Sequence, residues 1–386
     1  MNLTSEASTA QSEILHKRLP QRETVVRIGL LLIVFCTFLV SLELMGNAVT
    51  QLGSGFANQL FQITANPFVS LFIGLLATAV LKSSSATIST LTVLVSTQVI
   101  SLQNAVPMVI GANIGTTVTC IFVSMGHIVS RKEFRKAFTI ALSHNQFNLS
   151  TAIILFPLEY YFQAISQPAT WLAAGLKQLP GQSFFANLHL SEYTIKPLAG
   201  LFSGVVLSLP WVIMIASAVL LIVSLLSFTQ LLKGALISRA ETSFEKNFFK
   251  NPYKTLFWGA GITALIQSST VSTSVSTVLV AADKISPRRI YPFVLGANLG
   301  TTITGILASF SRPEIALALA MAHVLFNFIG IMLFFPYGQL RGWPLWLGRE
   351  VAQLCAKHRA AALIYVLLVF YILPFLIIFL VEKSYF

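Results

Sequence analysis

The sequence predicts an all-α polytopic membrane protein made of inverted-topology repeats, each with a re-entrant helical hairpin and three spanning helices. Of its 386 residues, 55% are hydrophobic and only 10% are charged, whereas soluble domains carry roughly 25% charged residues. The apolar residues also fall in runs of the roughly 20 residues that cross a bilayer. A doubled stretch and the distribution of basic residues predict the rest of the architecture.

The stretch 74–119 is repeated at 259–304 without a gap, at a constant offset of 185 residues, and 21 of the 46 positions are identical. An internal repeat of this kind indicates a fold built from two related units. Each copy sets a run of hydroxyl side chains inside strongly apolar sequence. Polar groups at membrane depth are costly unless they line a site, so the repeat predicts two related polar sites.

We expect each copy to contain a re-entrant hairpin, over 66–100 and over 255–283. In the first, the apolar halves flank the polar break Lys82–Ser85. Each half is about 16 residues, or about 24 Å as a helix, which is shorter than the hydrocarbon core of about 30 Å. Neither half needs to span, so the break is predicted to lie at the hairpin tip, near the middle of the membrane.

Seven other segments are long and apolar enough to span: 26–48, 104–126, 137–157, 198–228, 288–310, 314–336 and 361–381. The predicted organisation is an N-terminal cytoplasmic segment (1–25), repeat one (26–157), an extracytoplasmic loop (158–197), repeat two (198–336), and an amphipathic segment with the last spanning helix (337–386). Trp343 and Trp346 in that amphipathic segment are placed like interfacial anchors.

The basic residues predict the orientation. With the N-terminus in the cytoplasm and neither hairpin crossing, the cytoplasmic segments hold 20 of the 25 lysines and arginines, as the positive-inside rule requires. Arg135 and Lys246 are then cytoplasmic and Gly181 is outside. Three crossings per repeat invert the second copy, so hairpin one enters from outside and hairpin two from inside. Inverted repeats with broken helices are typical of secondary transporters.

The two tips offer eight hydroxyl side chains: Ser83, Ser84, Ser85, Thr87, Ser268, Ser269, Thr270 and Ser272. The half-helix that starts at a tip presents free backbone N–H groups, which suit an anion. The half-helix that stops there presents free carbonyls, which suit a small cation such as Na⁺. Serine and threonine in membrane helices often only bond the i−4 carbonyl, but two copies at one offset favour a binding site.

Buried amides and imidazoles follow the tips. Asn113 and Asn298 each lie in a Gly-Ala-Asn sequence; helix packing accounts for the glycines, but the amides need polar partners. Two further pairs, four residues apart and therefore on one helix face, are His144 with Asn148 and His323 with Asn327. For these pairs a helix–helix hydrogen bond is favoured over a ligand role.

Other chemistry is disfavoured. Cys36, Cys120 and Cys355 are too scattered for a disulfide framework or a zinc site, and no nucleophile–base pair or carboxylate pair indicates an enzyme. The net charge of +12 is explained by membrane topology rather than by nucleic-acid binding. Glu43 and Lys82 are the charged residues placed within the predicted segments rather than in their first or last turn. A central charge costs about 2.5–3.5 kcal/mol and faces the interior, so Lys82 is expected to face the site.

At these residues the chain resembles the type II sodium–phosphate cotransporter family. That family carries two Gln-Ser-Ser-Ser motifs in inverted repeats, each followed by Gly-(Ala/Ser)-Asn-x-Gly-Thr and His-x-x-Phe-Asn, and the likeness covers roughly 40–160 and 200–336. It implies a phosphate site at Lys82, Ser83, Ser84, Ser85, Gln267, Ser268, Ser269 and Thr270. It implies sodium ligands among Ser85, Thr87, Asn113, Thr116, Asn145, Gln267, Thr270, Ser272, Asn298 and Thr301. Supporting positions are Glu43, His144, Asn148, His323 and Asn327.

Three positions depart from the family pattern. Lys82 stands where the first motif has Gln, and Thr270 replaces the last Ser of the second motif. Asn145 stands where electrogenic members have Asp, which the resemblance ties to an additional coupled sodium. The disulfide-bearing outer loop of animal members is absent.

We therefore expect a sodium-coupled importer of inorganic phosphate in the cell (plasma or inner) membrane, working by alternating access with its substrates between the two tips. Its partners are phosphate, sodium and the lipid bilayer, with no cofactor beyond the coupling ion and no nucleic acid. The alternatives are another tetrahedral oxyanion or a sodium coupling altered by Lys82. An ion channel is disfavoured because the doubled tips are occluded, and an intramembrane enzyme because no nucleophile–base pair is found.

Overall fold

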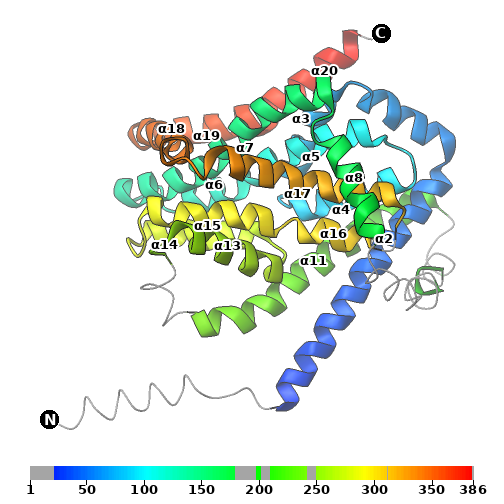
Figure 1. Cartoon of the computed structure of the whole chain (residues 1–386), viewed down its shortest axis with the longest axis horizontal. Helices are drawn as coiled ribbons and strands as arrows, with labels where there is room; N and C mark the ends of the chain where they lie inside the picture. The colour runs from blue at the N-terminus through cyan, green and yellow to red at the C-terminus, as the bar shows by residue number, and fades with distance from the viewer. Residues whose placement is uncertain (1–20, 179–196, 201–208, 241–248, 311, 385–386) are drawn as a thin grey trace.

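A computed structural model describes residues 21–178, 197–200, 209–240, 249–310 and 312–384 (Figure 1). Within these ranges every regular element is a helix, so the all-helical class predicted from the sequence is confirmed. The predictions for Gly181 and Lys246, and for most of the N-terminal segment, lie outside the described residues.

The described residues form a series of helices. In chain order they are α2 (Gln21–Thr64), α3 (Pro67–Leu81), α4 (Ser84–Ser96), α5 (Leu102–Thr116), α6 (Val118–Met125), α7 (Arg131–Phe162), α8 (Ser166–Lys177), α11 (Pro210–Ala240), α13 (Pro252–Ile266), α14 (Ser269–Ala281), α15 (Pro287–Gly300), α16 (Ile303–Ser309), α17 (Glu314–Phe334), α18 (Gly338–Lys357), α19 (Arg359–Leu367), η2 (Leu368–Ile372) and α20 (Leu373–Ser384).

Six segments of the described chain are long and apolar enough to cross a membrane: Ile28–Gly53, Leu102–Met125, Pro210–Ser227, Pro287–Ser309, Glu314–Phe334 and Arg359–Val381. They correspond to six of the seven predicted spans. The remaining one, 137–157, lies within the 32-residue helix α7, which is long enough to cross. Its hydropathy is lowered by polar side chains such as His144, Asn145 and Asn148, which are buried against protein.

Several predicted boundaries move. The first span belongs to a 44-residue helix, α2, whose backbone departs from helical geometry at Gly53. The second consists of two helices, α5 and α6, that meet at Thr117. The predicted span 198–228 is described as helix over 198–200 and again from Pro210, where proline is well tolerated at a helix start.

The two copies of the repeat have the same local structure. Helices α3 and α13 each have 15 residues, start after an asparagine cap and end at a residue in the left-handed region, Lys82 (φ 54°) and Gln267 (φ 57°). Helices α4 and α14 each have 13 residues and start after a serine cap, Ser83 and Ser268. Sequence identity at a fixed offset thus corresponds to identical helix ends.

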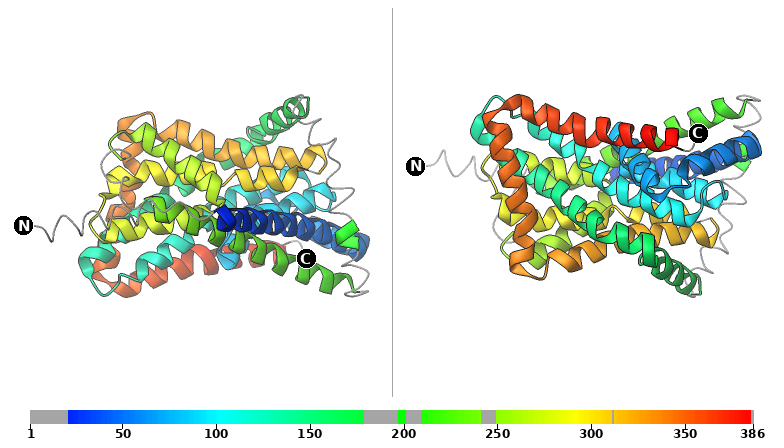
Figure 2. Two further views of the ribbon diagram at one scale, coloured as in Figure 1. Left: turned by 90° about the horizontal axis from the view of Figure 1, so that it is seen from below. Right: turned by 90° about the horizontal axis from the view of Figure 1, so that it is seen from above.

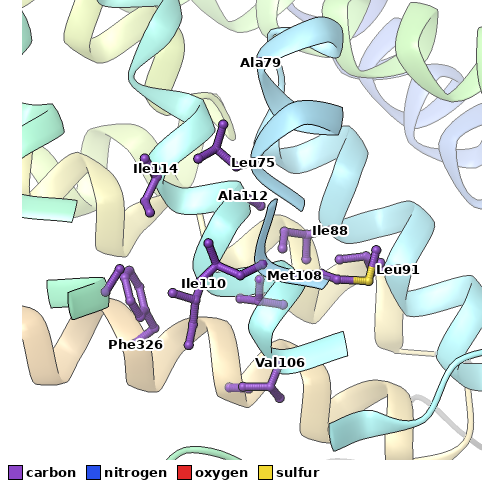
Figure 3. Close-up of a cluster of buried hydrophobic side chains, with 14 of the residues drawn as sticks. Leu75, Ala79, Ile88, Leu91, Val106, Met108, Ile110, Ala112, Ile114 and Phe326 are labelled. Atoms are coloured by element: carbon purple, nitrogen blue, oxygen red, sulfur yellow. The ribbon is translucent and has the colours of Figure 1, made fainter. Parts of the chain in front are cut away.

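Glycines set the packing beside each tip. A Cβ atom on Gly111 of α5 would lie 1.8 Å from the Leu71 carbonyl oxygen of α3, and one on Gly296 of α15 would lie 2.0 Å from the Leu256 oxygen of α13. Small residues allow such backbone contact in membrane helices. Buried side chains around the first contact form the main apolar core, which Figure 3 shows between α3, α4, α5 and Phe326 of α17.

The open ends of the two hairpins contact different parts of the chain. After α14, Asp283 accepts hydrogen bonds from Lys136 at the start of α7 and lies 3.4 Å from Lys132. The hydrogen bond from Lys136, with the charges of both lysines, lowers the pKa of the Asp283 carboxyl, so this carboxyl carries its negative charge at neutral pH. This contact fixes the end of hairpin two against the basic loop before α7.

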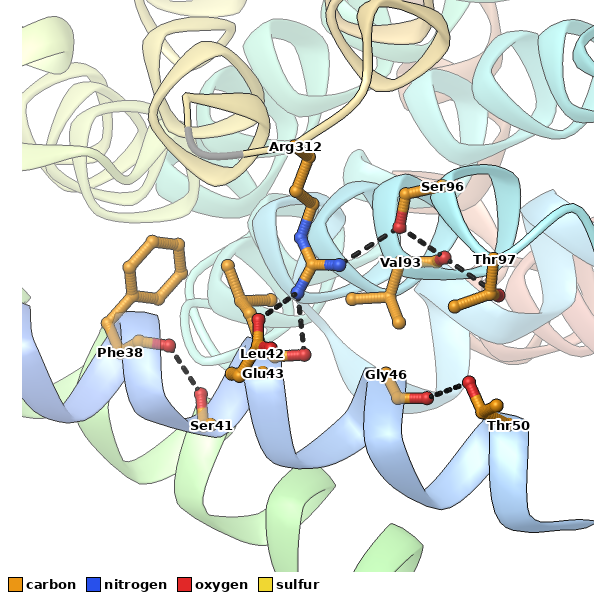
Figure 4. A network of polar contacts seen from close by, with 10 residues as sticks. All are labelled: Phe38, Ser41, Leu42, Glu43, Gly46, Thr50, Val93, Ser96, Thr97 and Arg312. Carbon is orange, nitrogen blue, oxygen red and sulfur yellow. Dashed lines mark hydrogen bonds and ion pairs between the residues drawn. The ribbon is translucent and has the colours of Figure 1, made fainter. Parts of the chain in front are cut away.

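The end of hairpin one is fixed by an arginine instead (Figure 4). The Arg312 guanidinium, between α16 and α17, donates to Ser96 Oγ of α4 (2.9 Å) and to the Leu42 carbonyl of α2 (2.7 Å). Glu43 lies 4.0 Å away and supplies the opposite charge. Glu43, predicted as a supporting residue, thus joins α2 to this arginine rather than facing the cavity between the tips.

Helix α18 has a different direction from its neighbours. It runs across one end of the bundle, close to the ends of α6, α7 and α19 (Figure 2), and it packs along α7. Trp343 and Trp346 on this helix are exposed and lie with ring centroids 5.5 Å apart, tilted by 40°. Exposed tryptophans on a helix across the bundle end are typical of the membrane interface.

Candidate functional site

The structure brings the two predicted tips together around one cavity of about 160 Å³. Its lining comes from both breaks and from α11: Lys82, Ser83, Ser84, Ser85, Leu225, Leu226, Gln267, Ser268, Ser269, Thr270 and Val271. All eight residues predicted to bind phosphate are in this set. Residues that are 185 positions apart in the sequence therefore face one small space.

Free backbone amides make the cavity suitable for an anion. The Ser83 hydroxyl accepts from the Ala86 amide, and the Ser268 hydroxyl accepts from the Val271 amide. The amides of the first two residues of each half-helix have no acceptor in the described part of the chain; they belong to Ser84, Ser85, Ser269 and Thr270. Unpaired amides at helix N-termini bind oxyanions, and here two such ends meet.

Oxygen atoms suited to a small cation gather beside Gln267. Ser85 Oγ donates to the Gln267 carbonyl (3.3 Å) and lies 3.5 Å from Thr301 Oγ1. Thr304 Oγ1 lies 3.5 Å from the same carbonyl. The two Ser85 contacts join hairpin one to repeat two through oxygens only. Hydroxyl and carbonyl oxygens are typical ligands of Na⁺ in broken-helix sites.

Thr304 was not among the sodium ligands predicted from the sequence. Its counterpart in repeat one is Thr119, at the same offset of 185 residues, and both are threonine. The Thr119 hydroxyl is buried without a hydrogen-bond partner in the described chain. The identity of these two positions was the sequence signal that could have added them.

The related position in repeat one is arranged differently. Lys82 replaces Gln267, and its ammonium lies 5.0 Å from the centroid of the Phe122 ring of α6, a distance at which a cation is attracted by an aromatic face. Thr116, a predicted sodium ligand, donates within its own helix to the Ala112 carbonyl (3.0 Å). The two halves of the site are therefore equivalent in backbone but not in their side-chain contacts.

Thr87 and Ser272, also predicted as sodium ligands, lie behind the tips. Thr78 donates to Thr87 Oγ1 (2.9 Å), and Thr263 donates to Ser272 Oγ (2.7 Å). These equivalent bonds tie the two halves of each hairpin together. Neither residue is among those lining the cavity.

A second polar cluster joins α5, α7, α15 and α17. His144 Nε2 lies 2.6 Å from Asn298 Oδ1, and the Asn298 amide donates to Asn148 Oδ1 (2.8 Å). On the other side, the Asn327 amide donates to Asn113 Oδ1 (3.0 Å). All five side chains are buried. Their hydrogen bonds run from one repeat to the other, as expected for a structural role. None of the five lines the cavity.

His323 and Asn145, two further predicted positions, differ in their hydrogen bonding. Both ring nitrogens of His323 are buried without a hydrogen-bond partner among the described residues, unlike His144. Asn145 donates to Thr117 Oγ1 (2.7 Å) and accepts from the Tyr365 hydroxyl (2.8 Å). Tyr365 belongs to the last spanning segment, outside both repeats, so no sequence pattern pointed to it.

Comparison with known proteins points to one family. A family model described as Na+/Pi-cotransporter matches residues 37–165 and 220–340. The chain is 27% identical to the sodium-dependent phosphate transport protein 2A of mouse, over 97% of this chain and 71% of that protein. It is 26% identical to the human protein 2B, over 90% of this chain and 64% of that protein.

Sheep protein 2A is 28% identical, over 91% of this chain and 67% of its own length, so the chain spans about two thirds of these relatives. No solved structure gives a significant match. The family model covers well over half of the chain, including both hairpin tips and both asparagine motifs. The chain therefore belongs to the Na+/Pi-cotransporter family.

Proposed function

We propose that this protein imports inorganic phosphate coupled to sodium, holding both between the two hairpin tips. The observation that carries the proposal is the single cavity lined by Lys82–Ser85 and Gln267–Thr270. Its unpaired amides suit a phosphate oxyanion, and the oxygens around the Gln267 carbonyl suit Na⁺. The relatives named above are sodium-dependent phosphate transport proteins, which supports this pairing of substrates.

The proposed architecture is a pair of inverted repeats with re-entrant hairpins. Asp283, at the end of hairpin two, contacts the basic residues Lys132 and Lys136, whereas Ser96, at the end of hairpin one, contacts Arg312. By the positive-inside rule the first contact belongs to the cytoplasmic side, with the N-terminus. The different partners of the two hairpin ends support a topology in which the hairpins enter the cell membrane from opposite sides.

Alternating access follows from that symmetry. If each hairpin blocks the path to one side, opening the cavity to one side requires a change in only one half of the molecule. The cross-repeat contacts of Ser85 with the Gln267 carbonyl and with Thr301 are at the outer limit of hydrogen-bond length, so an inserted Na⁺ can replace them. Sodium binding and the approach of the two tips are thereby linked, which is the basis of coupling.

The test is uptake of radiolabelled phosphate by proteoliposomes that contain the purified full chain. We expect accumulation with an inward sodium gradient and little with an equal potassium gradient. Unlabelled phosphate should compete, and sulfate should not. Equal uptake in both gradients would contradict sodium coupling, and stronger competition by sulfate than by phosphate would favour the alternative of another tetrahedral oxyanion.

A further inference from the structure

A second cavity, of about 320 Å³, lies at the bundle end where α7 begins and α18 ends. Its lining combines two helices: Arg131, Lys132 and Arg135 from the first turns of α7, with Gln353, Ala356 and Lys357 from the last turns of α18. Four of these six residues are cationic and none is acidic. This cavity has no part in the site between the hairpin tips.

The positive charge of the cavity is only partly balanced. Lys132 lies 3.4 Å from Asp283, but Arg131, Arg135 and Lys357 have no ion-pair partner among the described residues, and all three are exposed. Glu133 lies between Arg131 and Arg135 in the sequence, but its carboxylate is 3.4 Å from His127 and is not part of the lining. Three cationic side chains thus line one cavity, and no acidic residue is among its lining residues.

The walls of the cavity are held in place on both sides. At Gly348, α18 approaches α7 so closely that a Cβ atom would lie 2.7 Å from the Ser143 backbone nitrogen. Beyond α18, the Arg359 guanidinium donates to the Val129 carbonyl in the loop before α7 (3.1 Å). The cationic side chains are therefore mounted on two helices whose spacing is fixed, which lowers the ordering cost of binding an anion.

Helix α18, which forms one wall of the cavity, has the features of a helix at a membrane surface. Helix α18 runs across the bundle end (Figure 2), and it exposes Trp343, Trp346 and Leu354 along its length. Tryptophan is enriched at the boundary between headgroups and hydrocarbon. A cationic hollow beside such a helix meets the membrane surface before it meets free anions in solution.

We propose that this cavity binds the phosphate group of an anionic phospholipid. Arginine pairs with phosphate oxygens through two parallel hydrogen bonds, and two arginines and two lysines here surround a space large enough for a headgroup. Basic pockets at the cytoplasmic face of membrane proteins bind such lipids. The bound lipid would link α7, which carries Asn145 and Asn148, to α18 and through it to the last spanning segment.

The experiment compares two variants of equal charge by native mass spectrometry of the full chain in detergent, with phosphatidylglycerol titrated in. The pocket variant carries Arg131→Gln, Arg135→Gln and Lys357→Gln. The control carries Lys284→Gln, Arg288→Gln and Arg289→Gln, which removes three exposed cations near Asp283 but outside the cavity. At about 1 kcal/mol per cation, we expect on the order of a hundredfold weaker lipid binding in the pocket variant and little change in the control.

Each outcome decides the proposal. Equal loss in both variants would show general attraction to anionic lipid and would overturn a defined site. Displacement of the lipid by excess inorganic phosphate, together with phosphate binding in lipid-free detergent, would assign the cavity to the free anion instead. If the triple pocket variant does not fold, the single variants Arg135→Gln and Arg289→Gln form the same comparison, with about a fivefold loss expected for the first alone.

Discussion

At each hairpin tip, two residues separate the half-helices, and the first of them is in the left-handed backbone region. Lys82 has φ 54° and ψ 26°, and Gln267 has φ 57° and ψ 25°. Helices that end in this conformation most often use glycine, because a side chain makes it costly. The chain instead has a long polar side chain at both positions, and each lines the cavity.

The Lys82→Gln variant tests what the lysine does to coupling. Glutamine already occupies the equivalent backbone conformation at Gln267, so the change should not disturb the turn. A lysine ammonium offers only donors and cannot bind Na⁺ while protonated, whereas a glutamine carbonyl can. We expect Lys82→Gln to give a higher sodium Hill coefficient and faster phosphate turnover in proteoliposomes.

The control is Lys254→Gln, at the far end of α13 from the tip, which should leave the sodium dependence unchanged. Sodium curves and rates that are identical for Lys82→Gln and the unchanged chain would show that the ammonium remains on the Phe122 ring and takes no part in coupling.

The serines at the helix starts are expected to contribute to substrate affinity. Ser84→Ala and Ser269→Ala each remove a hydroxyl that lines the cavity. Losing a hydrogen bond to a charged ligand costs roughly 1.5–3 kcal/mol, so the apparent phosphate affinity should fall by about one to two decades. Uptake measured against phosphate concentration gives this value directly.

Ser89→Ala is the matched control, because Ser89 lies on the same helix with a buried hydroxyl that has no partner in the described chain. It should transport normally. Normal affinity in both Ser84→Ala and Ser269→Ala would mean that the tips hold substrate through backbone amides alone or not at all.

At the scale of the helices, glycine contacts decide whether each hairpin can lie against its neighbour. Gly74 and Gly111 meet the backbone of the opposite helix, and Gly259 and Gly296 repeat the arrangement at the second hairpin. Backbone cannot move aside as a flexible side chain can. The orientation of both tips toward the cavity therefore depends on these positions.

Gly111→Ala and Gly296→Ala should each lower the thermal unfolding temperature and the yield of monodisperse protein. Overpacking of a core typically costs 1–3 kcal/mol, and the approach of 1.8 Å and 2.0 Å to carbonyl oxygens puts both variants at or above the top of that range. Gly261→Ala, in α13 where a Cβ meets nothing within 4 Å, should be neutral. Equal stability of all three variants would contradict the close helix contact.

For the molecule as a whole, the proposed inverted topology has a testable consequence. Gln98 and Asp283 are equivalent in the repeat, both have positive φ (60° and 59°), and both are exposed at the end of a hairpin. Inverted repeats place them on opposite sides of the membrane. In a chain whose three natural cysteines are replaced, Gln98→Cys should react with an impermeant maleimide from outside intact cells, and Asp283→Cys only after the cells are opened.

Arg135→Cys provides an independent marker for the cytoplasmic side, since it lies in α7 near the lysines that contact Asp283. Labelling of Gln98→Cys and Asp283→Cys from the same side would exclude inverted repeats, even if phosphate transport itself were established.

The sequence by itself determined the helical membrane class, the repeat, the two breaks at Lys82 and Gln267, and the family. Each depends on local information: hydropathy over one helix, a motif of a few residues, or identity at a fixed offset. The exact helix ends were less predictable. The break at Thr117 and the burial of polar side chains on α7 depend on neighbouring helices rather than on hydropathy.

Only the tertiary structure decided which polar groups meet. Ser85 contacts the Gln267 carbonyl and Thr301, whereas Thr87 bonds inside its own hairpin. Yet both residues carry a hydroxyl group and they are only two positions apart in the sequence. Tyr365 reaches Asn145 from outside both repeats. The rotation and spacing of packed helices set these contacts, and close glycine contacts between distant segments fix that spacing, so no local pattern in the chain contains it.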